Sequence, residues 1–324
     1  MSRFASALVA WQKRHGRHGL PWQDTRDPYR VWLAEVMLQQ TQVAAVIPYY
    51  RRFLEKYPDV RALAAASENE VLRLWSGLGY YARGRNLHAA AKIISSRGFP
   101  RTSTAIQDLP GVGRSTAAAI AAFAFGRREA ILDGNVKRVL ARRFGISGTR
   151  ELWAKAEELL PETSIATYTQ ALMDLGATVC VRKNPRCAAC PVRKDCVART
   201  QDRIAELPPP RKKKILPLRK ATWYVFRCNG QVLLERRPGR GLWGGLWTFP
   251  EAPLTRAGKP RPLPAFEHGF THFRLRVRPV LFELKHSRIG DETKGRLWID
   301  VETARAAAVP TPVRTLLASL PKAL

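Results

Sequence analysis

The chain has 324 residues, with 55 Lys or Arg against 26 Asp or Glu, for a formal net charge of +29. Hydrophobic residues make up 45% of the sequence, enough for a folded core, so the chain is not a disordered polycation. The excess of positive charge favours a polyanionic partner, with nucleic acid ahead of an anionic membrane surface. No apolar run approaches the roughly 20 residues of a membrane span, and residues 1–20 lack a secretory pattern. We therefore expect a cytoplasmic protein.

The first part of the chain, residues 1–205, is predicted to be an all-α domain. Apolar residues recur at helical spacing from Arg3 to His15, and Asp27 followed by Pro28 is typical of a helix start. Gly or Pro separates most of the other helical segments. These are predicted at 28–40, 44–57, 68–75, 82–96, 114–125, 136–144, 152–160 and 165–175.

Residues 206–220 read ELPPPRKKKILPLRK, which is typical of a semi-rigid basic linker because proline-rich runs are extended. The basic run 211–214 is either a solvated charge cluster or a phosphate contact, and the sequence leaves both open. Beyond the linker, residues 221–324 are predicted to form an α+β domain. Asn229-Gly230 between two apolar segments indicates a β-hairpin. Strands are expected at 222–227, 231–236, 274–285 and 296–300, with a closing helix at 310–320.

Four of the five cysteines lie within 17 residues, a clustering that favours an inorganic centre in a reducing compartment over a disulfide framework. Structural zinc also accepts four cysteines, but usually through two tight C-x2–4-C pairs, and only one such pair is present. The wide, uneven spacing favours a [4Fe–4S] cluster while leaving zinc open. Cys228 is expected to be buried packing. The proposed ligands, within the loop 180–196, are Cys180, Cys187, Cys190 and Cys196.

A glycine-containing turn between two helices, Leu109 to Thr116, is a candidate site for a phosphate. Gly111 and Gly113 permit a tight turn whose backbone N–H groups point outward, and a helix N-terminus follows at once. Turns of this kind often connect two helices without binding an anion. In a chain of this charge, the anion would be a DNA phosphate, and Leu109 and Ile120 would anchor the turn in the core.

Two carboxylates have contrasting sequence environments. Glu35 lies in an otherwise uncharged apolar helix, where burial would raise its pKa toward that of a general acid. Asp133 immediately precedes a helix, where hydrogen bonds and the helix N-terminus would keep it ionised. The simpler alternatives are a solvent-facing glutamate and an ordinary N-cap. One protonated and one anionic carboxyl is the pair that cleavage of an N-glycosidic bond requires.

Six segments in the same order resemble the MutY family of adenine DNA glycosylases, in the helix-hairpin-helix glycosylase superfamily, over nearly the whole chain. They are Leu20–Trp22, Glu35–Gln42, Gly77–Arg83, Leu109–Thr116, Leu132–Arg138 and the four-cysteine spacing. The resemblance implies a DNA repair glycosylase that acts as a monomer on double-stranded DNA and removes adenine from pairs with 8-oxoguanine or guanine. It also favours the [4Fe–4S] cluster over zinc.

The resemblance assigns roles to individual residues. Glu35 would protonate adenine N7, Asp133 would stabilise or trap the sugar cation, and Asn135 would help to hold the reacting groups. A base-pair wedge, an adenine pocket and a backbone-binding hairpin are also implied, in keeping with base flipping. These are, respectively, Gln40 and Tyr80; Trp22, Gln170 and Met173; and Gly111, Gly113, Arg114 and Ser115. The competing interpretations are a helix-end amide for Gln40 and a core aromatic for Tyr80. For Trp22 and Met173 the competing interpretation is plain core packing.

The second domain resembles the Nudix-related lesion-recognition domain of that family through Gly241–Pro250. It lacks the glutamate-rich helix that binds Mg²⁺ in Nudix hydrolases, so pyrophosphate hydrolysis is not expected. The segment Phe270, Thr271 and His272 matches a loop that inspects 8-oxoguanine, with threonine where the family usually has serine.

Two other functions remain possible from the sequence. An endonuclease III-like enzyme for damaged pyrimidines would cleave the strand, but the lysine that forms its Schiff base is replaced by Ser115, which favours a monofunctional glycosylase. A non-catalytic iron–sulfur DNA-binding protein would not need Glu35 or Asp133.

Overall fold

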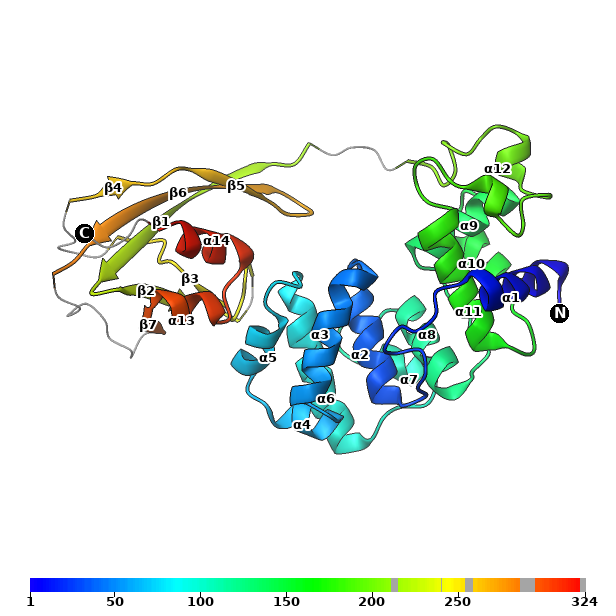
Figure 1. Ribbon diagram of the computed structural model, residues 1–324, viewed down its shortest axis with the longest axis horizontal. Coiled ribbons are helices and arrows are strands. Elements are labelled where there is room, and N and C mark those ends of the chain that lie inside the picture. Colours follow the sequence, from blue (N-terminus) through cyan, green and yellow to red (C-terminus); the bar gives the residue numbers. More distant parts are fainter. Residues whose placement is uncertain (211–214, 240, 254–258, 286–294, 321–324) are drawn as a thin grey trace. The chain divides into compact units, whose positions relative to one another are not determined.

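The computed structural model describes residues 1–210, 215–239, 241–253, 259–285 and 295–320 (Figure 1). The chain folds into two compact units, one of residues 1–65 and 86–212 and the other of residues 66–85 and 213–324. The basic run 211–214 lies outside the described residues, so its contact with DNA remains a prediction.

The first unit is helical. Its helices are α1 (Arg3–His15), α2 (Pro28–Leu38), α3 (Val43–Lys56), α4 (Val60–Ala65), α7 (Ser103–Gln107), α8 (Arg114–Phe125), α9 (Gly134–Phe144), α10 (Thr149–Glu158), α11 (Ile165–Asp174) and α12 (Val197–Thr200). Most of α6 (Tyr81–Arg97) also belongs to it. Helix α11 packs on α1, α8 and α9, and Figure 1 shows α1 and α11 side by side. Apolar side chains of α1, α8, α9, α10 and α11 share one core.

Local sequence explains where these helices begin and end. Ser2 caps α1, Asp27 caps α2 by accepting from the Tyr29 N–H, and Gly126 and Gly145 end α8 and α9 in the left-handed conformation. Leu109 and Ile120 are buried, as predicted. The short helices α4, α7 and α12 were not predicted, because fewer than two turns give little hydrophobic periodicity.

Helix α11 continues without a break into a π-helical turn, η1 (Leu175–Val179), and a single 3-10 turn, η2 (Cys187–Ala189), follows in the cysteine loop. The sequence predicts one helix over 165–175 and shows no sign of the change. Wide turns of this kind are rare and often occur at functional sites. Here η1 packs on α9, which begins directly after Asp133.

The second unit contains helix α5 (Glu68–Trp75), a sheet and two C-terminal helices, α13 (Val301–Ala306) and α14 (Thr311–Ser319). The described strands are β1 (Leu218–Cys228), β2 (Gln231–Arg236), β3 (Trp247–Thr248), β4 (Arg261–Pro262), β5 (Phe266–Gly269), β6 (Arg274–Glu283) and β7 (Arg296–Asp300). Strand order is β3-β2-β1-β6-β4, with β5 also on β6 and β7 on β2. The fold class is therefore the predicted one, a helical part followed by an α+β part.

Strands β1 and β2 form the predicted hairpin, with Asn229 and Gly230 both in the left-handed conformation. Strand β1 also pairs in parallel with β6, and Cys228 at its end is buried, as expected of packing. Because β1 begins at Leu218, the last three residues of the predicted linker are strand, not linker. The short strands β3, β4 and β5 and helix α13 were not predicted.

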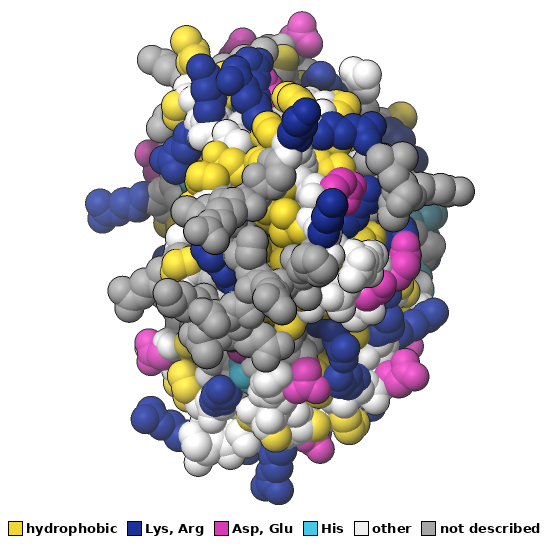
Figure 2. All heavy atoms as spheres, turned by 90° about the vertical axis from the view of Figure 1, so that its left-hand side faces the viewer, with side chains coloured by type: hydrophobic (Ala, Val, Ile, Leu, Met, Phe, Trp, Pro, Cys, Tyr) yellow, Lys and Arg dark blue, Asp and Glu magenta, His cyan; other side chains and the backbone are white. Residues whose placement is uncertain are grey.

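Basic side chains are spread over the face that Figure 2 shows, rather than gathered in one patch. Among the described residues, no helix combines the length and apolar character that a membrane crossing requires.

Candidate active site

A cleft of about 860 Å³ in the first unit contains both candidate catalytic carboxylates. Glu35 reaches it from α2 and Asp133 from the start of α9. The cleft extends from the α2–α3 turn to α11, so residues far apart in the sequence meet there. Its lining also includes Trp22, Gln40, Ser115, Asn135, Gln170 and Met173. The structure thus brings together predicted residues of the acid pair, the adenine pocket, the hairpin and the wedge.

Glu35 is half-buried on α2, whose surrounding side chains from Val31 to Met37 are buried. Desolvation raises the pKa of Glu35 from 4.5 to about 8, and the nearby Asp133 charge adds to the increase. The carboxyl is therefore protonated at neutral pH. This is the state that the apolar sequence around it predicts for a general acid.

Asp133 is the N-cap of α9 and accepts hydrogen bonds from the Asn135 and Val136 N–H groups, both at 2.8 Å. These bonds and the Arg138 guanidinium lower its pKa, but burial outweighs them, so the net pKa lies above the ordinary value of 3.8. Local sequence indicates only the lowering contributions. The N-cap interpretation is confirmed, while the protection of the charge is weaker than expected because the side chain also lines a partly enclosed cleft.

Asn135 is oriented by a guanidinium to which the sequence alone assigned no role. Arg138 donates to Asn135 Oδ1 at 2.8 Å and to the carbonyl oxygens of Gly176 and Cys180, each at 2.7 Å. Arg138 therefore ties the start of α9 to η1 and to the first cysteine. Its spacing of three residues from Asn135 places both on one helix face, which is the one signal that could have indicated the contact.

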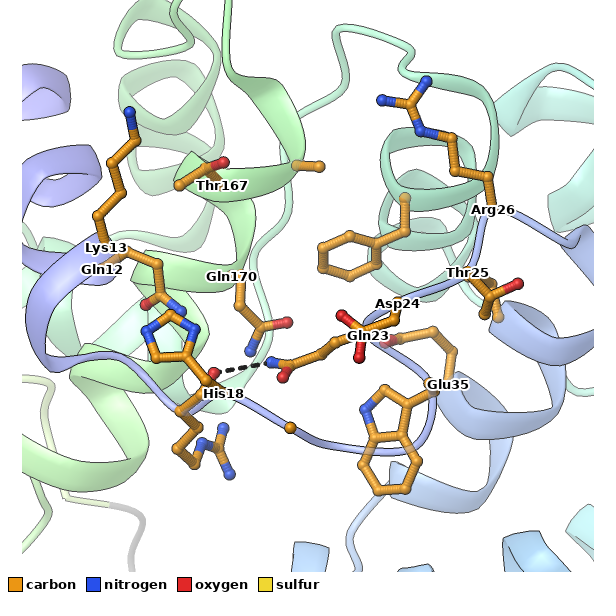
Figure 3. Close-up of a pocket in the computed structure, with 16 residues that line it drawn as sticks. Gln12, Lys13, His18, Gln23, Asp24, Thr25, Arg26, Glu35, Thr167 and Gln170 are labelled. Carbon is orange, nitrogen blue, oxygen red and sulfur yellow. Dashed lines mark hydrogen bonds between the residues drawn. The ribbon is translucent and has the colours of Figure 1, made fainter.

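The predicted adenine-pocket residues meet at the edge of the cleft. Trp22 is buried against Tyr50, with ring centroids 5.3 Å apart, and still lines the cleft. Met173 packs against the helical core and lines the cleft as well. Core packing and pocket lining are therefore not alternatives for these two residues. Gln170 and Glu35 also line an adjoining cavity of about 420 Å³, into which they project from opposite walls (Figure 3).

The hairpin between α7 and α8 contains the four predicted backbone-binding residues. Gly111 has φ = 79°, and Gly113 is the exposed N-cap of α8. A terminal nitrogen of the Arg114 guanidinium lies 2.6 Å from Glu157 Oε1, and the guanidinium stacks over the Trp153 ring. Arg114 is therefore bound to two side chains of α10. The Ser115 hydroxyl accepts a hydrogen bond from the Leu132 N–H, which links the hairpin to the residue before Asp133.

The two predicted wedge residues belong to different units. Gln40, just after α2, is exposed with φ = 57°, and Tyr80 is 48% exposed with φ = 49°. Left-handed backbone is strained for residues with side chains and concentrates at functional sites. Tyr80 is therefore not the core aromatic of the simpler interpretation, whereas Gln40 does lie at the end of α2, one residue after its C-cap.

The predicted inspection loop lies between β5 and β6 of the second unit. Phe270 stacks on Phe273 and contacts His268 edge-on, and its N–H donates to the Phe273 carbonyl. Thr271 and His272 are exposed at the tip of this turn. Packed aromatic rings therefore support the turn in which Thr271 and His272 are exposed.

The four clustered cysteines line one small cavity and none is in a disulfide. Arg142, Arg193 and Arg199 line the same cavity, and the Arg142 guanidinium lies 3.6 Å from Cys180 Sγ. Among the described residues, no three acidic, His or Cys side chains are grouped as a ligand set for one metal ion. Burial raises the pKa of the Cys190 thiol to about 11. Four unpaired thiols around one cavity with arginines beside them suit an anionic inorganic cluster.

Comparison with known proteins identifies relatives of both units. The profile of HhH-GPD superfamily base excision DNA repair proteins matches residues 33–162, and that of the NUDIX domain matches residues 221–319. The adenine DNA glycosylase of Buchnera aphidicola subsp. Baizongia pistaciae is 33% identical, over 98% of this chain and 97% of its own. The human adenine DNA glycosylase is 34% identical, over 97% of this chain and 73% of its own.

A solved thermostable thymine-DNA glycosylase has a TM-score of 0.57 and 31% identity, covering 61% of this chain and 95% of that one. Endonuclease III in a non-covalent complex with DNA has a TM-score of 0.54 at 22% identity, covering 62% of this chain and 95% of that one. The second likeness concerns the fold alone.

Proposed function

Because the chain belongs to the adenine DNA glycosylases, we propose that it excises adenine mispaired with 8-oxoguanine or guanine by base flipping and acid-assisted hydrolysis. The observation that carries this proposal is the presence of Glu35 and Asp133 in one cleft, with the pKa of Glu35 raised to about 8. The family relationship supports DNA binding and DNA glycosylase activity in base excision repair. The opposite base and the roles of single residues are the proposal.

The proposed reaction uses one carboxyl as an acid and the other as an anion. Glu35 donates its proton to adenine N7, and the C1′–N9 bond then breaks with its electron pair leaving on the base. The Asp133 carboxylate stabilises or traps the cation at C1′. Water finally adds at C1′ and gives up a proton, which leaves an abasic site and free adenine. Asn135, oriented by Arg138, would help to hold the reacting groups.

The experiment is release of adenine from an A·8-oxoguanine duplex under single turnover. Wild type should release adenine, and E35Q and D133N should each lose at least about a hundredfold in rate, the usual contribution of a general acid. Full activity in both variants would contradict the mechanism. Absence of release by wild type would contradict the substrate.

We also propose that the enzyme is monofunctional. Ser115 lines the catalytic cleft, but its hydroxyl is engaged by the Leu132 N–H and it has no amine for a Schiff base. Wild type should therefore leave the strand intact until base or heat is added. S115K should form a borohydride-trappable adduct, because it places an amine in the cleft.

Recognition of the mispair is proposed to divide between the two units. Gln40 and Tyr80 would enter the duplex, the Gly111–Ser115 hairpin would bind the backbone, and Phe270, Thr271 and His272 would inspect 8-oxoguanine. The exposure of Tyr80, Thr271 and His272 supports these roles. H272A and T271A should narrow the preference for 8-oxoguanine over guanine opposite adenine while leaving adenine release from A·G pairs unchanged.

We propose that Cys180, Cys187, Cys190 and Cys196 hold a [4Fe–4S] cluster. When bound, it would cross-link residues 180–196 as a rigid loop beside α9. Iron and acid-labile sulfide should be found in near-equal amounts in anaerobically purified protein and be lost in C187A. Stoichiometric zinc in a colourless preparation would contradict this assignment.

A further inference from the structure

A buried carboxylate at the end of α11 lies behind the proposed adenine pocket without lining it. Asp174 is completely buried, and its oxygens accept hydrogen bonds from two glutamine side chains and one arginine. Burying a charge is unfavourable unless it is paired and hydrogen-bonded. The partners of Asp174 therefore have to be held in place.

Arg17 supplies the compensating charge. Its Nε lies 2.7 Å and its terminal nitrogen 2.6 Å from Asp174 Oδ1, and its backbone N–H donates to Oδ2 at 2.8 Å. A carboxylate beside this guanidinium can only accept hydrogen bonds. Whatever else contacts Asp174 must therefore present a donor.

Gln170 meets that requirement through its amide nitrogen, which donates to Asp174 Oδ1 at 2.9 Å. This contact fixes the orientation of the Gln170 amide, because its carbonyl oxygen would repel the carboxylate if the amide were reversed. Its oxygen is left facing the cavity that Glu35 also lines, as Figure 3 shows. Within the described part of the chain, no donor bonds to this oxygen.

Gln12 is held in the same way on the other carboxylate oxygen. Its Nε2 donates to Asp174 Oδ2 at 3.0 Å, and Gly16 leaves room for its amide, because a Cβ there would lie 2.2 Å from it. Asp174 therefore orients two amides at once and connects α1 to α11 behind the pocket.

We propose that Asp174 is a positioning residue that fixes the Gln170 carbonyl oxygen as a hydrogen-bond acceptor in the pocket, so that the site favours a base with an exocyclic amino group and disfavours one with a carbonyl there. The inference rests on the proposed function, since it concerns which flipped purine the cleft accepts. Adenine offers N–H donors at C6. Hypoxanthine offers an oxygen at that position, which would face the oxygen of Gln170.

The test compares release of adenine, unsubstituted purine and hypoxanthine opposite 8-oxoguanine, as single-turnover rates with the pairs held otherwise identical. The three bases differ in intrinsic lability, so each variant's rate ratios are compared with those of wild type. D174N is nearly isosteric but replaces one of the two acceptor oxygens with an NH₂ donor, so Gln12 and Gln170 can no longer both donate to position 174 and a carboxylate no longer fixes the Gln170 amide with its oxygen toward the pocket. Its adenine-to-hypoxanthine ratio should fall by about tenfold, roughly one hydrogen bond.

Exchanging the acid and the amide supplies the rescue. In D174N/Q170E the amide at position 174 donates and the carboxylate at position 170 accepts, so an acceptor oxygen again faces the pocket and the adenine preference should return. Q170M keeps the Asp174–Arg17 pair, replaces a half-buried side chain and should also lose the preference. It serves where D174N does not fold.

Two results would overturn the inference. One is an equal slowing of all three bases in D174N, which would make Asp174 only a staple between α1 and α11. The other is an unchanged ratio in Q170M. Failure of the proposed function is distinguishable, because wild type would then release no adenine.

Discussion

Glu35 sets the expected pH dependence of the reaction. Because its pKa is raised to about 8, the carboxyl is protonated below that pH and loses its proton above it. The single-turnover rate of adenine release should therefore fall about tenfold per pH unit above pH 8. On the acid side the rate should fall once Asp133 is protonated. A rate that rises through pH 9 would contradict Glu35 as the acid.

The same raised pKa predicts that Glu35 lowers the free energy of unfolding at neutral and higher pH. Between its ordinary pKa of 4.5 and about 8, folded protein holds a proton on Glu35 that unfolded protein has lost. The free energy of unfolding therefore decreases with rising pH through that window, by up to about 1.4 kcal/mol per unit, and is level above it. E35Q should melt at a higher temperature than wild type at pH 8 and at nearly the same temperature at pH 4.5. E55Q, an exposed glutamate on α3, is the control and should match wild type at both.

The two glycines of the hairpin are expected to serve different purposes. Gly111 has φ = 79° and a Cβ there would lie 2.8 Å from Asn86 Cβ, whereas a Cβ at Gly113 would meet nothing within 4 Å. G111A should lower stability by about 1–2 kcal/mol through left-handed backbone strain alone. G113A should lose less than about 1 kcal/mol of stability, the difference between glycine and alanine at an N-cap, but bind DNA more weakly, because its methyl group obstructs the approach of a phosphate. Unchanged affinity of G113A would argue against a phosphate site.

At the scale of single residues, the sequence predicts the effect of neighbours in the same helix better than the effect of residues from distant elements. The apolar run around Glu35 correctly indicates an acid with a raised pKa, since the perturbing residues are its neighbours in the helix. For Asp133, local sequence reveals the backbone hydrogen bonds but not the burial that outweighs them, because burial comes from distant helices. Asp174 and Arg17, which are 157 residues apart, were missed for the same reason.

At the scale of elements, the contact between η1 and α9 has almost no tolerance. A Cβ at Gly176 would lie 2.6 Å from Asn135 Cβ and 2.9 Å from the Asn135 carbonyl oxygen. G176A should therefore push η1 away from α9, lower stability by about 1–3 kcal/mol and reduce adenine release with it. Circular dichroism melting and single-turnover kinetics measure the two effects.

Gly134 provides the control for stability, because a Cβ there would meet nothing within 4 Å. G134A should melt at or slightly above the temperature of wild type, because Gly134 is the first residue of α9 and alanine favours a helix over glycine. Equal melting of G176A and G134A would mean that η1 and α9 are not closely packed in solution.

Long elements with a clear period are predictable from the sequence, and short or irregular ones are not. The predicted bounds of α1, α5, α8, β2 and β7 match the structure. The π turn η1 escapes prediction because it continues the apolar pattern of α11 and differs only in hydrogen bonding. Strands β3 and β4 have two residues each, too few for alternation to be recognised.

At the scale of the whole molecule, the formal charge of +29 predicts how binding responds to salt. Each phosphate contact releases counterions, so six to ten contacts would weaken DNA binding by about 10³–10⁵ between 50 and 200 mM salt. This contribution is independent of sequence and should affect undamaged duplex and A·8-oxoguanine duplex alike. The ratio of their dissociation constants, measured by fluorescence anisotropy, should therefore vary far less with salt than either constant.

The reason is that recognition of the mispair is proposed to rest on Tyr80, Thr271 and His272, which carry no formal charge with His neutral. H272A should accordingly lower the ratio at every salt concentration without changing the slope of either binding curve. A changed slope in H272A would mean that this side chain contacts phosphate as a cation. Equal salt dependence of the ratio and of nonspecific binding would mean that charge, and not inspection of the base, distinguishes the mispair.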